Sequence, residues 1–308
     1  MIIQKSFEAD RVIAISQTAH AWVSGQLARQ WGNECFPSFA PAEPLCYAAE
    51  QHDRGFLDWE RKPTLNPKSG LPHTFENIPL SLQVELRKKS ILELKAVSRY
   101  ASLVTSIYFA RAASKQNDVS SHADRQRIAE FLEEQQTLQR ELLGSLRKDP
   151  YLRSACSDRA IEYNRRLLAA WDQLSIELCR NPDCQFSVSN VPTVLKRSCR
   201  LLVTPADTNS REIRLAPWPF SKPRVELTCE GHVLDRRFTS EADLREYLKG
   251  APRVSVIYTL TPATDKQLSV GTGHDRNKNG SRCQAGELAS GRSTVGRGSV
   301  RAADVSDR

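Results

Sequence analysis

The chain of 308 residues lacks any apolar run that approaches the roughly 18 residues of a membrane-spanning helix. Its first ten residues also lack the charged and then apolar order of a signal peptide. Its eight cysteines are scattered and none forms a Cys-x-x-Cys pair, which disfavours a structural zinc site and favours reduced, buried thiols. We therefore expect a cytoplasmic protein that does not insert into a membrane.

Common catalytic signatures are missing as well. The sequence contains no Gly-x-Ser-x-Gly elbow, no Walker loop, no Gly-x-Gly-x-x-Gly loop and no His-Glu-x-x-His helix. A Cys-His nucleophile stays open, but nothing selects one of the cysteines. Lys and Arg exceed Asp and Glu by 44 to 36, a formal charge of +8, without any dense basic block. This balance favours a small anionic substrate or ligand over nucleic acid.

Hydrophobic periodicity predicts helices in the first part of the chain, about residues 1–181. Apolar residues recur at three- and four-residue spacings in the segment that ends at His52 and in residues 12–31, 82–90, 92–113, 121–146 and 160–179. Between two of these segments, residues 59–79 are rich in Pro, Asn and Gly, which predicts a long loop of the kind that is often functional.

The composition changes after the last of these helices. Short apolar runs separated by turn signals predict half-buried antiparallel strands and one short capped helix. The runs are residues 199–203, 213–215, 225–229 and 254–258, and the helix starts at Ser240 and ends near Gly250. Residues 263–308 have almost no large apolar side chains, which predicts disorder.

The expected fold is therefore mainly α. It comprises a helical domain over residues 1–181, a β-rich (α+β) appendage over 182–262 and a disordered tail over 263–308. This division rests on composition and hydrophobic pattern alone.

The most informative local feature is the adjacent pair His52-Asp53, which offers one nitrogen and one oxygen ligand from a single short segment. His20 and Asp172 lie in predicted helices on either side of it in the sequence. Asp172 follows Trp171 in an apolar segment, where an ionised carboxylate is costly unless it is paired or metal-bound, although it also fits the polar flank of that helix. The four residues together predict a metal site, whereas the dipeptide alone is weak, because it recurs at residues 274–275.

The order His20, His52-Asp53, Asp172 resembles the ligand order of the HD superfamily of metal-dependent phosphohydrolases. This resemblance implies an HD-like helical bundle in which these four residues hold a metal and Asp53 has a catalytic role, such as bridging to a second ion. A mixed nitrogen and oxygen set suits Mn, Fe, Co, Ni or Zn better than Ca. Such an ion polarises a phosphoryl oxygen and lowers the pKa of water. The expected reaction is phosphoester hydrolysis on a small anionic metabolite or nucleotide.

Three more residues are candidates for contacts with the substrate. His73, in the predicted loop, is a candidate catalytic proton donor to the leaving group. Arg54 and Arg111 are candidates for binding the anion. The alternatives stay open, because His73 also fits an exposed loop histidine and Arg111 a solvent-facing side chain.

Several separated motifs connect the chain to one family. They are residues 17–21, Trp31-Gly32, residues 50–60, residues 70–75, residues 171–179 and Trp218-Pro219-Phe220. With these motifs, residues 10–262 resemble the domain of unknown function 3891 family, which implies no substrate.

The chain departs from that family's pattern at two places. The family usually reads His-Asp-Asp-Gly-Trp, whereas this chain has Arg54 and Phe56, and Tyr108 stands where the family tends to carry a histidine. These departures motivate an alternative function, a non-catalytic ligand-binding or sensor module on the same scaffold. A third option is a structural protein in which the polar residues only form hydrogen bonds.

Overall fold

The computed structural model describes residues 1–5, 11–115, 121–194, 197–207 and 211–263. Residues 1–265 form one compact unit, which contains both the expected helical domain and the expected β-rich appendage. The tail predicted to be disordered lies outside the described residues, apart from residue 263.

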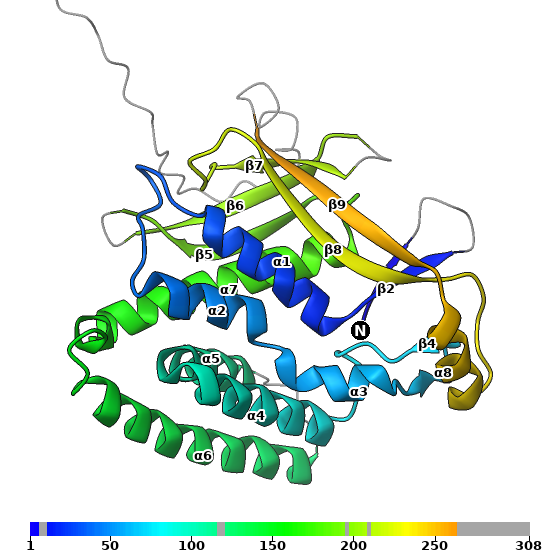
Figure 1. Cartoon of the computed structure of the whole chain (residues 1–308), viewed down its shortest axis with the longest axis horizontal. Coiled ribbons are helices and arrows are strands. Elements are labelled where there is room, and N and C mark those ends of the chain that lie inside the picture. Colours follow the sequence, from blue (N-terminus) through cyan, green and yellow to red (C-terminus); the bar gives the residue numbers. More distant parts are fainter. Residues whose placement is uncertain (6–10, 116–120, 195–196, 208–210, 264–308) are drawn as a thin grey trace, which may run out of the picture. The chain divides into compact units, whose positions relative to one another are not determined.

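A curled seven-stranded sheet forms one layer of this unit (Figure 1). Its order is β1-β2-β8-β9-β7-β6-β5, so the first two strands of the chain lie in one sheet with strands that are more than 170 residues away. Neighbouring strands are antiparallel except β7 and β9. The strands are β1 (Ile2–Lys5), β2 (Val12–Ile15), β5 (Phe186–Pro192), β6 (Ser198–Pro205), β7 (Glu212–Ala216), β8 (Val225–Leu234) and β9 (Arg253–Pro262).

Helices cover one face of the sheet in successive layers (Figure 1). Helix α1 packs on β8, and α7 packs on β1 and β5. Helix α2 lies against both of these helices, α5 lies against α7 and α2, and α4 and α6 lie against α5. The helices are α1 (Gln17–Gln30), α2 (Ala42–Gln51), α3 (Leu57–Arg61), α4 (Leu80–Val97), α5 (Arg99–Ala113), α6 (His122–Leu146), α7 (Asp158–Arg180) and α8 (Glu241–Gly250). Two short 3-10 helices are η1 (Arg54–Phe56) and η2 (Arg153–Cys156).

Serine side chains set where five of the helices begin. Each accepts a hydrogen bond from the backbone N–H three residues further on, which satisfies a donor that the helix itself leaves unpaired. The capping residues are Ser16, Ser98, Ser121, Ser157 and Ser240. Among the described residues, no helix is long and apolar enough to cross a membrane.

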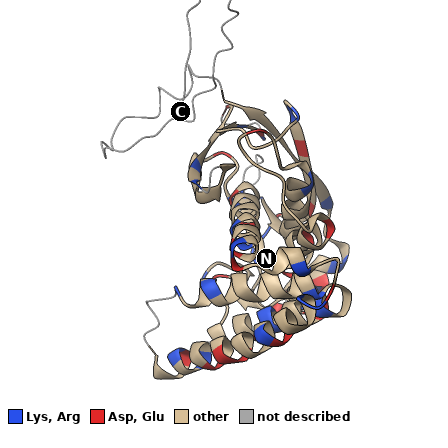
Figure 2. Ribbon diagram, turned by 90° about the vertical axis from the view of Figure 1, so that its left-hand side faces the viewer, with Lys and Arg blue, Asp and Glu red and all other residues tan. Residues whose placement is uncertain are grey.

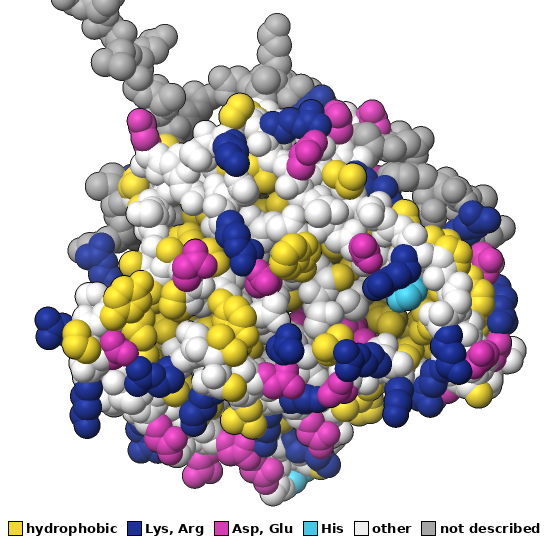
Figure 3. All heavy atoms as spheres, viewed as in Figure 1, with side chains coloured by type: hydrophobic (Ala, Val, Ile, Leu, Met, Phe, Trp, Pro, Cys, Tyr) yellow, Lys and Arg dark blue, Asp and Glu magenta, His cyan; other side chains and the backbone are white. Residues whose placement is uncertain are grey.

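Charges of both signs are interspersed over the surface. Figure 2 shows acidic and basic residues along α6, the lowest helix in that view, and Figure 3 shows both signs scattered over the face seen there.

The predicted fold class is wrong. The protein is α+β with a large sheet, not a mainly α, HD-like helical bundle. The error arises at the start of the chain, where Val12 and Ile15 continue the apolar spacing of α1 and were predicted to be helical. In the structure they belong to β2, whose partner β8 is more than 200 residues away, with Val12 opposite Leu234. Such a partner leaves no local signal, because strand preference depends on cross-strand packing.

Most other elements are confirmed. The helices predicted over residues 121–146 and 160–179 are α6 and α7, and each apolar run of the second region is a strand. The loop predicted over 59–79 is partly wrong, because it contains the end of α3 and a hairpin of β3 (Leu65–Asn66) and β4 (Leu71–Pro72). Gly70 closes this hairpin with φ of 66°, a conformation that favours glycine.

Candidate metal centre

His20 reaches the centre of the molecule from the first turn of α1. Strand β2 is fixed in the sheet, and Ser16 Oγ caps the helix immediately after it by accepting from Ala19 N at 3.0 Å. The buried carboxylate of Glu60 also accepts a hydrogen bond from Gln17 N, at 2.8 and 2.9 Å to its two oxygens. This bond ties the same end of α1 to α3. His20 therefore projects from a doubly held helix terminus, and its side chain is fully buried.

His52 and Asp53 come from the end of α2. His52 is the C-terminal cap of this helix, and its Nδ1 donates to the carbonyl oxygen of Ala49 at 2.9 Å. This bond fixes the orientation of the ring and directs Nε2 toward the cluster, an arrangement common in metal-binding histidines.

The chain turns sharply after this pair because α4 lies directly against it. A Cβ atom at Gly55 would lie 2.2 Å from Leu86 O and 2.5 Å from Ser90 N, so only glycine fits this position. Gly55 N donates to Ser90 Oγ at 2.9 Å. Glycine at this position thus allows α4 to support the segment that presents Asp53.

Asp172 completes the group from the middle of α7. Its Oδ1 lies 2.9 Å from His52 Nε2 and 3.7 Å from His20 Nε2. The Tyr108 hydroxyl of α5 donates a short hydrogen bond to the other oxygen, Oδ2. Asp172 is thereby held by one imidazole and one phenol, although only 6% of it is exposed.

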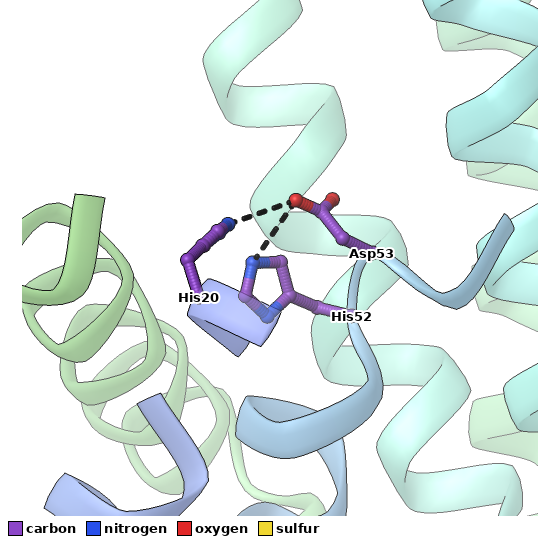
Figure 4. A group of neighbouring side chains, drawn as sticks. All are labelled: His20, His52 and Asp53. Carbon is purple, nitrogen blue, oxygen red and sulfur yellow. Dashed lines mark hydrogen bonds and ion pairs between the residues drawn. The ribbon is translucent and has the colours of Figure 1, made fainter. Parts of the chain in front are cut away.

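Asp53 and both imidazoles meet at one point, and Asp172 lies beside the two imidazoles. Asp53 Oδ2 lies 3.0 Å from His20 Nε2 and 3.7 Å from His52 Nε2. Figure 4 shows both rings directing a nitrogen at this oxygen from separate elements. The possible ligand atoms of His20, His52 and Asp53 all lie within 4.8 Å of one another, the only such group found in the described parts of the chain.

Burial and charge give the two histidines opposite properties. Desolvation lowers the pKa of His20 to about 3, so this ring is neutral at pH 7. Desolvation also disfavours the charged form of His52, but the attraction of Asp53 and Asp172 outweighs it and raises the pKa to about 9. In the metal-free protein His52 is therefore protonated at pH 7.

The two carboxylates differ in the same way. Burial raises the pKa of Asp53 to about 7. Burial acts against ionisation of Asp172 too, but the charge and hydrogen bond of His52 outweigh it and lower the pKa of this group. Without a metal, His52 and Asp172 therefore form an ion pair. Asp53 shares a hydrogen bond with the neutral His20. His20 Nδ1 is left buried without a hydrogen-bond partner among the described residues.

The donor set fits a divalent transition metal. Ligand bonds of about 2.0–2.2 Å place adjacent ligand atoms about 3.0–3.5 Å apart, and the four nitrogen–oxygen separations here are 2.9, 3.0, 3.7 and 3.7 Å. Two imidazoles and two carboxylates suit Mn, Fe, Co, Ni or Zn. An ion would replace the protons and balance the two buried carboxylates.

The structure brings together all four predicted ligands but not the other three predicted residues. Arg54 is half exposed and pairs with Glu93 at 3.4 Å. His73 Nδ1 lies 3.0 Å from Thr64 Oγ1 in the β3–β4 region. Arg111 is exposed in the last turn of α5.

Sequence reasoning missed Arg87 and Glu60. Arg87 of α4 lies close enough for its charge to lower the pKa of Asp53, and Glu60 holds the start of α1. Arg87 is followed by Lys88 and Lys89, so the sequence gave no reason to prefer it. For Glu60, the available signal was its place at the end of the family motif of residues 50–60, which gave it no role.

The family assignment follows from a comparison of the whole chain. Residues 1–236 match the family described as a protein of unknown function, DUF3891. This chain belongs to the DUF3891 family. No curated protein and no solved structure matches it.

The DUF3891 match contains the entire cluster, since all four ligand candidates precede residue 236. It confirms the family predicted from the sequence motifs. The match ends just after β8, so β9, which lies between β8 and β7 in the sheet, is outside it.

Proposed function

We propose that this DUF3891 protein is a metal-dependent hydrolase that acts on a phosphoester of a small anionic metabolite or nucleotide. The observation that carries the proposal is the meeting of His20, His52 and Asp53 at one buried point, with Asp172 within 3.7 Å of both imidazoles. Burying four ionisable side chains together is unfavourable for stability alone, and such clusters concentrate at functional sites.

The residues around the cluster hold it in a geometry suited to this chemistry. A divalent transition metal, when bound, supplies the positive charge that polarises a phosphoryl oxygen and lowers the pKa of water. The Ala49 carbonyl holds the His52 ring, and the Tyr108 hydroxyl orients the Asp172 carboxylate. Asp53 lies 3.0 Å from His20 Nε2, so its carboxylate is placed to hold the ion together with this imidazole.

The charge near the cluster supports an anionic substrate. The Arg87 guanidinium lowers the pKa of Asp53, so a cation lies beside the candidate ligands. The chain as a whole has a formal charge of +8. Both features favour a phosphorylated molecule over a neutral one.

The alternative is a non-catalytic ligand-binding or sensor module. The bond from Tyr108 to Asp172 Oδ2 favours it, because this bond occupies one carboxylate oxygen. The ligand candidates are also at most 6% exposed, which limits the access of substrate. The two functions differ in one respect that can be measured, since only the hydrolase turns over a substrate.

The decisive experiment combines metal analysis with a hydrolysis screen. Wild type, Asp172→Asn and Asp158→Asn are purified without an affinity tag and their metal content is measured by mass spectrometry. Asp158 is a matched control, because it lies on the same helix α7 and its side chain is 99% exposed. We expect nearly one metal per chain in wild type and in Asp158→Asn, and a large loss in Asp172→Asn.

The same three proteins are then tested on p-nitrophenyl phosphate, bis-p-nitrophenyl phosphate and nucleotides. Hydrolysis by wild type and Asp158→Asn, but not by Asp172→Asn, supports the hydrolase. Metal without any turnover supports the sensor module instead. A wild-type protein that stays metal-free after incubation with Mn, Fe, Co, Ni or Zn salts would refute the hydrolase and leave the ligand-binding module or a structural protein.

A further inference from the structure

Arg87 lies in the turn of α4 that packs against the His-Asp segment. Leu86 O and Ser90 N approach the Gly55 backbone so closely that a Cβ atom there would clash with both. The Ser90 hydroxyl also accepts a hydrogen bond from Gly55 N at 2.9 Å. Arg87 thus lies between two residues of α4, Leu86 and Ser90, that contact Gly55, and Gly55 follows the candidate ligand Asp53 by two residues.

The guanidinium of Arg87 is held next to the cluster by an aromatic ring. Its Cζ lies 5.5 Å from the centroid of the Phe109 ring, and Phe109 is 5% exposed. The Phe109 ring in turn lies 6.3 Å from the ring of His52. The Arg87 charge lowers the pKa of both Asp53 and Tyr108, which is consistent with this position.

One end of this guanidinium has no partner. Nη1 of Arg87 is buried without a hydrogen bond in the described part of the chain. The next two residues of α4 are paired, Lys88 with Glu134 and Lys89 with Asp58. Among the described residues no carboxylate forms an ion pair with Arg87, although buried N–H donors are nearly always satisfied.

We propose that Arg87 binds a phosphoryl oxygen of the substrate at the edge of the metal centre, through the donor that the protein leaves unpaired. This inference rests on the proposed function and narrows its substrate to molecules with a phosphate group next to the reacting centre. A guanidinium fits the role because its planar set of donors matches phosphate oxygens, whereas an ammonium offers only a compact charge.

The test uses inorganic phosphate as the probe and the full-length, metal-loaded protein. Phosphate affinity is measured by calorimetric titration for wild type, Arg87→Gln, Arg87→Lys and Lys88→Gln. Lys88→Gln is the matched control, since it removes a neighbouring charge on α4 that already has a carboxylate partner. Metal content and thermal unfolding are recorded for each variant, so that a folding defect or a loss of metal is recognised.

Loss of a hydrogen bond to a charged group weakens binding by about tenfold or more. We therefore expect Arg87→Gln to raise the phosphate Kd by at least about tenfold, Arg87→Lys to raise it less, and Lys88→Gln to leave it within about twofold. Metal content is expected to be unchanged. If Arg87→Gln does not fold, the difference in Kd between Arg87→Lys and wild type decides.

The inference is overturned if wild type binds no phosphate, or if a folded, metal-loaded Arg87 variant binds it as tightly as wild type. In the second case Arg87 only stacks on Phe109. Failure of the proposed function gives a different result. In that case wild type hydrolyses no substrate in the screen described above, whatever the phosphate Kd values of the variants are. If wild type hydrolyses a phosphoester and Arg87→Gln hydrolyses it with the same KM, the inference about Arg87 is refuted and the hydrolase function stands.

Discussion

Two histidines in one buried cluster differ in charge because their partners differ. His52 has a carbonyl acceptor on one nitrogen and a carboxylate on the other, so its pKa rises to about 9. His20 has a carboxylate on one nitrogen only, and burial dominates, so its pKa falls to about 3. A metal would replace the His52 proton without any rearrangement of the ring.

The hydrogen bond from the Tyr108 hydroxyl to Asp172 can be tested by a single substitution. Tyr108→Phe removes the donor to Asp172 Oδ2 and leaves the ring in place. Loss of such an orienting bond weakens metal binding by about 10- to 100-fold. Metal Kd is measured by competition with a chelator, with Tyr151→Phe as the control, since Tyr151 is 80% exposed. Equal affinity in Tyr108→Phe and wild type would mean that Asp172 needs no orientation by the phenol.

The four candidate ligands were predictable from residue type and order, whereas the residues around them were not. An Asp in an apolar helix face and an adjacent His-Asp are visible in the sequence. Arg87 and Glu60 act through tertiary contacts between segments whose pairing no local pattern specifies. Arg54, chosen for its position next to Asp53, pairs with Glu93 instead.

At the scale of elements, the cluster depends on how closely helices approach one another. The contact between η1 and α4 requires glycine at residue 55, and the contact between α1 and α2 is also close at Gly25, where a Cβ atom would lie 2.7 Å from Glu50 Cβ. These approaches place the ends of α1 and α2 against α7, where the ligands meet.

Gly55→Ala is expected to destabilise the protein and weaken metal binding. The added methyl group would lie 2.2 Å from a backbone oxygen of α4, so the segment after Asp53 must move. We expect a loss of about 1–3 kcal/mol in the free energy of unfolding, the range for overpacking. Denaturant unfolding and metal titration measure the two effects.

Gly144→Ala is the matched control for this substitution. Gly144 lies in α6, and a Cβ atom there would meet nothing within 4 Å. Alanine is more favourable than glycine in a helix by about 0.8–1.0 kcal/mol, so the free energy of unfolding of this variant should be slightly higher than that of wild type. A Gly55→Ala protein as stable as Gly144→Ala would show that α4 can shift away freely.

At the scale of the whole molecule, the cluster ties together segments that are far apart in the sequence. His20 follows a strand of the sheet, His52 and Asp53 end a helix, and Asp172 lies on a helix packed against β1 and β5. A metal at this point would connect the sheet-packed helices α1 and α7 to α2.

Metal removal should therefore lower the unfolding temperature. A ligand present at 100 times its Kd stabilises the folded state by about 2.7 kcal/mol, and each kcal/mol shifts Tm by about 2–4 °C in a protein of this size class. Calorimetry of the metal-loaded and chelator-treated protein measures this shift. Asp172→Asn should show none, and a shift of equal size in that variant would place the metal elsewhere.

The sequence by itself determined the helices that bury a regular apolar stripe, four of the five strands of the second half (β6 to β9), the family and the four candidate ligands. Each of these leaves a signal in the spacing or type of nearby residues. Only the tertiary structure decided the fold class, because β2 is a strand by virtue of its pairing with β8, and it alone placed Arg87 at the centre. Pairing and packing between distant segments depend on the whole folded chain, so no local pattern encodes them.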